Sequence, residues 1–167
     1  MAETGILRSD DRVELIDGEV LTMAPQKSPH ATAVRLAEEA LRAAFGVGFE
    51  VRPQLPLTLG EASEPEPDLA VVPGTPRDYR ESHPTTALLV VEVAETSLAF
   101  DRSVKQALYA RSGIPEYWIV DLEDRALEIY RSPHGSDYRE RRTLSEADSV
   151  APVARPEAAI AVADLLP

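Results

Sequence analysis

The sequence contains no cysteine, and this absence removes several kinds of chemistry at once. Without cysteine there can be no disulfide, no thiolate nucleophile and no thiolate zinc site. Histidine is also scarce, because only His30, His83 and His134 are present and they lie far apart in the chain. A metal ion would therefore have to be held mainly by oxygen, which favours magnesium, manganese or calcium.

Long hydrophobic runs and an excess of positive charge are missing as well. No window approaches the ~20 apolar residues that cross a bilayer, and residues 1–18 show no basic segment followed by an apolar one. We therefore expect a soluble cytoplasmic protein with no membrane partner. The net charge is −12, from 17 basic and 29 acidic residues, and it disfavours loose attraction to nucleic acid because Lys and Arg drive phosphate binding.

Aromatic residues make up only 5% of the chain, so aliphatic side chains must fill most of the core. A chain of 167 residues is about the size of one domain. Its 14 prolines and 8 glycines are scattered rather than run together, which favours short connections over a disordered tail. The sequence therefore predicts a single domain over residues 1–167.

Hydrophobic periodicity predicts a mixture of helices and strands. We expect a hairpin over residues 13–24 with its turn at Asp17-Gly18, a helix over 30–45, and a second helix that starts near Phe100 and ends before Gly113. The first expected strand lies within FEVRPQLPLTLG, whose two prolines indicate an edge position or a bend. The other expected strands are PDLAVV, ALLVVEVA, EYWIVD, ALEIYR and YRERRTL, and the C-terminal segment PEAAIAVADLLP is expected to dock on the body. This order predicts an α/β or α+β fold, with a mixed sheet flanked by helices.

The stretch LLVVEVAETS, residues 88–97, places Glu92 inside an aliphatic run. An unpaired ionised carboxylate in an apolar interior costs far more than the net stability of a domain, so Glu92 needs a partner. Side chains alternate along a strand, so Glu92 shares a face with Val90 and Ala94. If the strand PDLAVV is a neighbour, Asp68 at its start can converge with Glu92.

The second predicted helix adds a cation to these carboxylates. Asp101, Lys105 and Tyr109 follow one another at a spacing of four residues and form one polar stripe. Lys105 can bury its alkyl stem and aim its ammonium at Glu92. Two carboxylates and a lysine above a sheet suit a hard cation such as Mg²⁺, which takes one or two carboxylates and retains waters.

Asp68, Glu92 and Lys105, with a helix before and after them, resemble the PD-(D/E)XK phosphodiesterase superfamily of restriction-endonuclease-like proteins. Five segments resemble, more specifically, the Uma-two family of endonucleases. They are ELIDGEV at 14–20, PDLAVV at 67–72, VVEVAETS at 90–97, the D-x-x-x-K-x-x-x-Y run at 101–109 and GIPEYWIVD at 113–121. The similarity spans nearly all of residues 13–131.

The resemblance implies a sheet with an αβββαβ core and a magnesium- or manganese-dependent endonuclease acting on nucleic acid, with DNA as the first candidate. It implies that Asp68 and Glu92 bind the metal and that Lys105 lies near the attacked phosphate. Two positions depart from the pattern. Ala94 stands where a lysine would complete E-x-K, so Lys105 would have to substitute from the helix. Glu95 stands where a serine is usual, and its charge would tighten metal binding but repel a phosphate.

Charge arguments suggest roles for the other candidate residues. A lysine near two carboxylates keeps its proton, so we expect Lys105 to stabilise developing negative charge rather than to act as a general base. Tyr109 is expected to hold Lys105 or a substrate oxygen, and Asp101 to fix the position of Lys105. Glu14 and Glu19 on the hairpin are candidates to complete the coordination of the metal.

Other interpretations remain open at this point. A nuclease-derived scaffold that no longer cuts would serve as a binding or assembly module. A purely structural protein would instead pair Glu92 with an arginine such as Arg52 or Arg111. His30, near the start of the first helix, either caps or packs there or belongs to the site.

Two features bear on partners. The basic cluster YRERR at 138–142 is either a solvated strand face or a contact for nucleic acid. ALEIYR is expected to form an exposed sheet edge, and an exposed edge needs to be covered or blunted. A symmetric homodimer is the commonest solution, so we expect one.

Overall fold

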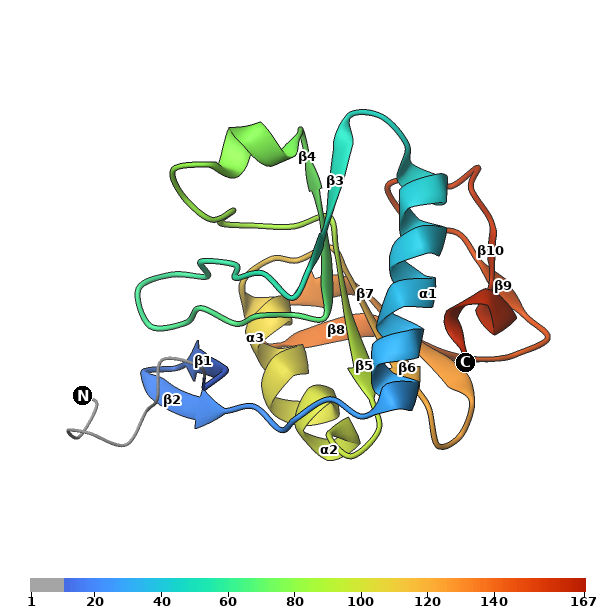
Figure 1. Cartoon of the computed structure of the whole chain (residues 1–167), viewed down its shortest axis with the longest axis horizontal. Helices are drawn as coiled ribbons and strands as arrows, with labels where there is room; N and C mark the ends of the chain where they lie inside the picture. Colours follow the sequence, from blue (N-terminus) through green and yellow to red (C-terminus); the bar gives the residue numbers. More distant parts are fainter. Residues whose placement is uncertain (1–10) are drawn as a thin grey trace.

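The computed structural model of the chain describes residues 11–167, so the first ten residues of the expected domain lie outside the described part. The fold is a mixed six-stranded sheet in the order β3-β4-β5-β6-β7-β8, with a long helix on one face and shorter helical segments on the other (Figure 1). An N-terminal hairpin precedes them. The α/β architecture predicted from the sequence is confirmed.

The hairpin consists of β1 (Val13–Ile16) and β2 (Glu19–Thr22), which pair antiparallel. Asp17 and Gly18 connect them with φ values of 51° and 80°. A two-residue hairpin turn with positive φ at both central positions matches the right-handed twist of the strands, and Asp-Gly adopts it at low cost. The predicted turn is therefore in the expected place.

Helix α1 (Ser28–Phe45) covers one face of the sheet and begins two residues before the predicted start. Pro29 lies in its first turn, where a missing backbone N–H breaks no helical hydrogen bond. Its buried side chains pack against inward residues of β3 (Phe49–Pro53), β4 (Leu69–Pro73) and β5 (Leu89–Ala94). They are Ala33, Val34, Ala37, Leu41 and Phe45.

The central strand of the sheet is β5, and all six of its residues are buried. It pairs antiparallel with β4, with Leu69 opposite Val91, and parallel with β6 (Glu116–Asp121). Alternate residues of β5 belong to two different cores, one under α1 and one on the opposite face. This two-sided burial explains the nearly continuous aliphatic run, because a strand covered on both faces needs apolar residues at every position.

The connection from β5 to β6 is helical throughout, but it is not one regular helix. It runs through α2 (Leu98–Phe100), the π-helical segment η2 (Asp101–Lys105) and α3 (Gln106–Arg111). The predicted helix is thus present, whereas its π-helical turn has no signal in the hydrophobic pattern. Single π-helical turns are frequent at functional sites.

The remaining strands are β7 (Ala126–His134), β8 (Asp137–Ser145) and the short pair β9 (Ser149–Val150) and β10 (Ile160–Ala161). The expectation that ALEIYR forms an exposed edge is wrong, because β7 pairs with β6 on one side and β8 on the other. The YRERRTL segment forms β8 and covers that edge. The free edge of β7 therefore no longer supports the prediction of a homodimer.

Two 3-10 helices complete the fold, η1 (Pro76–Tyr79) in the loop after β4 and η3 (Val162–Leu165) near the C-terminus. Val162 and Leu165 are buried in the core under α1, so the C-terminal segment docks on the body as predicted. Within residues 11–167, no helix has both the length and the apolar character to cross a membrane.

Candidate active site

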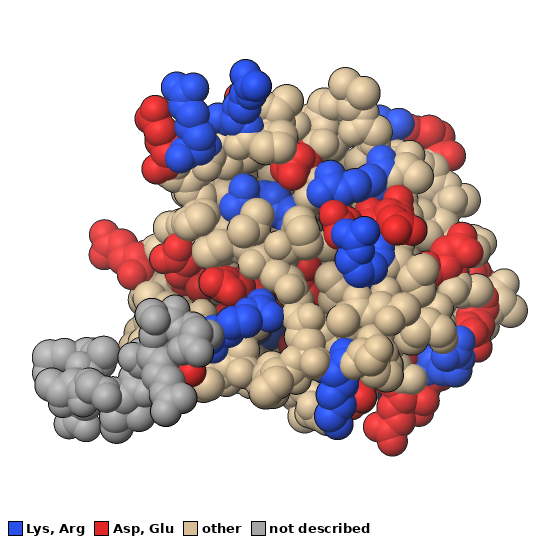
Figure 2. Space-filling model, viewed as in Figure 1, with Lys and Arg blue, Asp and Glu red and all other residues tan. Residues whose placement is uncertain are grey.

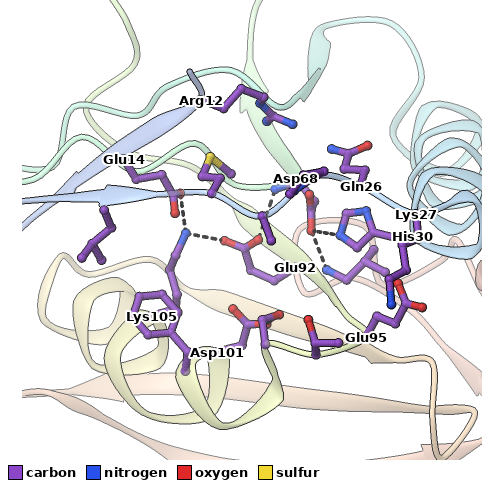
Figure 3. Close-up of a pocket in the computed structure, with 18 of the residues that line it drawn as sticks. Arg12, Glu14, Gln26, Lys27, His30, Asp68, Glu92, Glu95, Asp101 and Lys105 are labelled. Atoms are coloured by element: carbon purple, nitrogen blue, oxygen red, sulfur yellow. Dashed lines mark hydrogen bonds and ion pairs between the residues drawn. The ribbon is translucent and has the colours of Figure 1, made fainter. Parts of the chain in front are cut away.

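Asp68 and Glu92 converge at one end of the β4–β5 pair (Figure 3). Asp68 immediately precedes β4, and the register that sets Leu69 opposite Val91 places it beside Glu92. The backbone N–H of Asp68 donates to Glu92 Oε2 at 3.3 Å. Asp68 Oδ2 accepts the backbone N–H of Val93 at 2.8 Å. The convergence expected from the sequence therefore follows from the strand register.

Lys105, at the end of the π-helical turn, is the cation that pairs with Glu92. Its Nζ lies 3.1 Å from Glu92 Oε1 and 2.5 Å from Glu14 Oε1, and the residue is only 3% exposed. Burial alone would lower the pKa of Lys105, but the carboxylates of Glu92 and Glu14 outweigh burial and raise that pKa above its ordinary value. Lys105 is therefore a protonated ammonium inside the protein.

The two arginines considered as partners of Glu92 are engaged elsewhere, so the expected pairing of Glu92 with Arg52 or Arg111 is wrong. Arg52 donates to the carbonyl oxygen of Pro56 and lies over the ring of Tyr79. Arg111 pairs with Asp17 at the turn of the hairpin. An arginine is not required for Glu92, because the helix after β5 delivers Lys105 directly above it.

Tyr109 completes the hydrogen bonds of Glu92. Its hydroxyl donates to Glu92 Oε1 at 2.7 Å, and Lys105 Nζ lies 5.9 Å from the centroid of its ring. Burial raises the pKa of Glu92 well above its ordinary value; Lys105 opposes this, and the carboxylates of Asp68, Asp101 and Glu14 add to it. Glu92 thus lies in a region where negative charge is in excess.

Asp101 lies at the start of the π-helical turn and is 4% exposed. The hydroxyl of Ser97 donates to its Oδ2 at 2.6 Å. Burial raises the pKa of Asp101 to about 6; Ser97 and Lys105 oppose the rise, and the negative charges of Asp68 and Glu14 add to it. Asp101 therefore acts on Lys105 through charge, whereas the hydrogen bond that orients its own carboxylate comes from Ser97.

The two hairpin glutamates have different environments. Glu14 is buried, and its Oε1 accepts both Lys105 Nζ and the backbone N–H of Glu66 at 2.8 Å. Glu19 is exposed beside the turn, away from the end of the hairpin that lines the pocket. The structure therefore brings Glu14 into the site but does not bring Glu19 there.

His30 belongs to the site, which settles the choice that the sequence left open. It lies in the first turn of α1, and its Nε2 is 3.2 Å from Asp68 Oδ2. The hydrogen bond to Asp68 raises the pKa of His30 and outweighs the opposite effect of burial. Its Nδ1 is buried without a hydrogen-bond partner among residues 11–167. The imidazole and the backbone N–H of Val93 therefore hold the same carboxylate oxygen, Oδ2, of Asp68.

Most of these groups border a pocket with a volume of about 360 Å³, whereas Tyr109 and Glu19 do not line it; those that do are Glu14, His30, Asp68, Glu92, Asp101 and Lys105. The hairpin, the start of α1, the end of β5 and the start of the following helix supply its walls. Sequence reasoning missed several lining residues; only Ser97, four residues before Asp101, carried a signal in its spacing. The missed residues include Arg12, Lys27, Ser97 and Phe100, whereas Glu95, noted as an extra charge, does line the pocket.

The donor groups of this pocket fit a hard divalent cation that keeps most of its waters. Within the part of the chain that the structure describes, no group of three or more His, Asp or Glu side chains is placed to hold a metal ion together. Mg²⁺ needs only one or two carboxylates, however, and Asp68 and Glu92 supply two adjacent ones. A donor set based on carboxylate oxygen favours Mg²⁺ or Mn²⁺ over zinc.

Comparison with known proteins agrees with this architecture. Residues 3–163 match the model of the Uma2 family, described as "Putative restriction endonuclease". The fold is similar to the crystal structure of a "putative nuclease belonging to DUF820" from Anabaena variabilis ATCC 29413, with a TM-score of 0.75 and 17% sequence identity over 96% of this chain and 92% of that chain. No curated protein matches the chain. Because the family match covers nearly the whole sequence, this chain belongs to the Uma2 family.

Proposed function

We propose that this protein is a metal-dependent endonuclease that hydrolyses phosphodiester bonds in nucleic acid, with DNA as the first candidate. The observation that carries the proposal is the meeting of Asp68 and Glu92 over one pocket beside the buried ammonium of Lys105. Stabilising the charge on a phosphoryl group is the main task of such an enzyme, and positive groups fixed in a water-poor site do this well. Membership of the Uma2 family supports the same activity.

Asp68 and Glu92 would hold Mg²⁺ or Mn²⁺, and neighbouring groups keep both carboxylates in place. Val93 and His30 fix Asp68, while Tyr109 and the backbone of Asp68 fix Glu92. Such orientation of ligands by surrounding hydrogen bonds is as important to a metal site as the ligands themselves. Bound there, the cation would supply Lewis-acid polarisation of a phosphoryl oxygen and acidification of water.

Lys105 would stabilise the negative charge that develops on the phosphate. Its pKa is raised above the ordinary value by Glu92 and Glu14, against the effect of burial, so it donates protons in hydrogen bonds and does not abstract them. Glu14 already accepts one of these hydrogen bonds, so a phosphate that reaches Lys105 shares the ammonium with Glu14. Lys27 and His30 line the pocket at the N-terminus of α1. The partial positive charge of this helix end would add to the charge of Lys105 in attracting a phosphate.

Cleavage assays on single- and double-stranded DNA and RNA, with Mg²⁺ or Mn²⁺ and with EDTA, test the proposal. We expect metal-dependent cleavage that falls by at least about 100-fold in Asp68→Asn, Glu92→Gln and Lys105→Met proteins. Glu19→Gln is the matched control, because Glu19 is an exposed carboxylate outside the pocket. Cleavage at the wild-type rate in both Asp68→Asn and Glu92→Gln would remove these residues from the mechanism.

The second candidate is a binding or assembly module that keeps the nuclease fold without cutting. Glu95 on the pocket wall favours it, because its charge adds to those of Asp68, Glu92 and Asp101 and repels a phosphate. Titration calorimetry separates the two candidates. Tight Mg²⁺ binding by a protein that cleaves none of the substrates would favour the module.

The symmetric homodimer remains a prediction, but its first argument no longer holds, because β8 covers the edge of β7 that was expected to be exposed. The outer strand of that side of the sheet is β8, which carries Arg139, Arg141 and Arg142, and charged side chains on an edge disfavour pairing with a second copy. Sedimentation velocity at several protein concentrations decides between a monomer and a dimer.

A further inference from the structure

The pocket also indicates the form of the substrate. We propose that it takes an unpaired segment of nucleic acid, one nucleotide of which enters with its base against Phe100, and that it excludes an intact duplex. This inference rests on the nuclease proposed above. It follows from the enclosure of the charged groups, the fixed walls, the apolar lining and the charges on the outer surface.

Enclosure of the charged groups is the first argument. Asp68 and Glu92 are each 6% exposed and Lys105 is 3% exposed, so a phosphate must enter the pocket to touch them. The cavity of about 360 Å³ is near the lower end of the ~300–1,000 Å³ typical of pockets that enclose one small ligand. A duplex is too wide and too stiff to follow one of its phosphates into a cavity of this size, whereas an unpaired strand can bend into it. Enzymes that bind a base inside a pocket likewise act on single strands or flip the nucleotide out of the duplex.

The hairpin wall of the pocket is built into the fold and is not a loose cover. Leu15 and Glu64 exchange backbone hydrogen bonds, one at 2.7 Å and the other at 3.4 Å. Gly18 N–H donates to the carbonyl of Ala62 at 2.8 Å, and the hydroxyl of Ser63 accepts the N–H of Asp17 at 3.0 Å. Opening the pocket for a duplex would break this whole row of hydrogen bonds.

The lining of the pocket suits a base flanked by phosphates. Phe100 is half-buried in the wall, where Leu21 and Met23 also contribute apolar surface. Stacking on an aromatic ring tolerates any base, because every base has a π-face. Arg12 and Lys27 line the same pocket; Arg12 lies 3.8 Å from a carboxylate oxygen of Glu66, and Figure 3 shows Lys27 beside His30 and Glu95. These two residues are the cations to which we assign the phosphates next to the inserted nucleotide.

The face of the molecule in Figure 2 offers little for holding a duplex. On the described part of the face in Figure 2, basic and acidic side chains are interspersed and form no continuous basic stripe. Some arginines of the β7–β8 region pair with carboxylates, as Arg125 does with Glu146 and Arg141 with Asp137, whereas Arg139 and Arg142 are exposed on β8. Tight duplex binding depends on many Lys and Arg contacts to phosphates. On this face, the cations at the pocket are the groups placed to attract the strand.

Binding measurements test the substrate form without requiring turnover. Fluorescence anisotropy in EDTA compares a labelled single-stranded oligothymidine with a blunt duplex of equal length. We expect the single strand to bind at least about tenfold more tightly, and Phe100→Ala to weaken its binding by about tenfold. Phe100→Leu keeps apolar volume but lacks the ring, so it should weaken binding similarly. Val104→Ala, an exposed change in the adjoining segment η2, should have no effect.

The same oligonucleotides are then tested for cleavage with Mn²⁺, so that the two proposals can fail separately. Duplex binding as tight as single-strand binding, wild-type affinity in both Phe100 variants, or no binding of either form overturns the inference. If duplex DNA is cleaved as fast as the single strand, the nuclease stands and the inference fails. If nothing is cleaved but the single-strand preference and its dependence on Phe100 remain, the inference about the ligand stands and the nuclease proposal fails. Circular dichroism confirms that the Phe100 variants are folded.

Discussion

Lys105 and Glu92 form an ion pair inside the protein, with Nζ 3.1 Å from Oε1 and both side chains less than 8% exposed. This pair explains how an aliphatic strand tolerates a carboxylate. It also concentrates charge, because Glu14 shares the same ammonium and Asp68 and Asp101 lie close by. One lysine thus faces several carboxylates, an arrangement that a divalent cation would stabilise.

Removing the lysine should be costly. In Lys105→Met protein, Glu92 and Glu14 lose their buried partner, so we expect the free energy of unfolding to fall by ~3–5 kcal/mol in urea denaturation. Arg111→Ala breaks the more exposed pair with Asp17 and should cost less than ~1 kcal/mol. The double variant Lys105→Met/Glu92→Gln should be destabilised by less than the sum of its single variants. A Lys105→Met protein as stable as wild type would contradict the account of this pair.

Asp101 should make stability depend on pH with an unusual sign. Its pKa is raised by burial from 3.8 to about 6, so the folded state holds the proton more tightly than the unfolded state. Its contribution is complete below pH 3.8 and is lost as pH rises through about 6. A shift of this size corresponds to up to about 3 kcal/mol.

Urea denaturation of wild-type and Asp101→Asn proteins at pH 4 and pH 7 measures this contribution. The variant should gain stability relative to wild type between the two pH values, because asparagine stays neutral. Asp164→Asn changes an exposed aspartate and serves as the control. A constant difference between wild type and Asp101→Asn would show that Asp101 does not titrate abnormally.

Metal binding should be visible as added stability. A ligand that binds only the folded state at 100 times its Kd stabilises by ~2.7 kcal/mol, so saturating Mn²⁺ should raise the midpoint of thermal unfolding of the wild-type protein. Asp68→Asn should abolish this increase in the midpoint, and Glu19→Gln should retain it, because Asp68 borders the pocket and Glu19 does not. Equal stabilisation of the Asp68→Asn protein would show that the cation binds elsewhere.

Position 94, where a lysine would complete the E-x-K pattern, is occupied by Ala94, and restoring the lysine should not increase the cleavage activity of this protein. Ala94 is 1% exposed and belongs to the apolar core under α3, where Phe100 also packs. Ala94→Lys forces a long charged side chain into this space, and overpacking alone costs ~1–3 kcal/mol. We expect lower stability in urea and no gain in cleavage. Ala94→Val separates the effect of volume from that of charge, and a more active Ala94→Lys protein would contradict this explanation.

The local pattern of the chain was sufficient for most elements. Asp17-Gly18 predicts the hairpin turn, because few other sequences adopt its positive φ values cheaply. The helical spacing of apolar residues predicts α1 to within two residues at its start. The two-sided aliphatic pattern of residues 88–94 predicts that β5 is central. These features depend on neighbours in sequence, so they can be inferred without knowing the tertiary contacts.

Assignments that depended on which strand lies next to which were less reliable. ALEIYR reads like an edge strand, and only the pairing of β8 along its free side places it in the interior. The roles of Glu14 and Glu19 likewise depend on which end of the hairpin meets the body. Their sequence environments are similar, but one glutamate is buried against Lys105 and the other is exposed.

The sequence by itself determined most of the elements, the two carboxylates and the lysine of this site, because alternation and helical spacing specify the direction of each side chain relative to its own backbone. Only the tertiary structure decided that His30 holds Asp68, that Glu14 shares Lys105 and that Phe100 lines an enclosed pocket. Those contacts join residues far apart in the chain. They depend on strand register, on the docking of the hairpin and on a π-helical turn, which arise from packing and leave no periodic signal in the sequence.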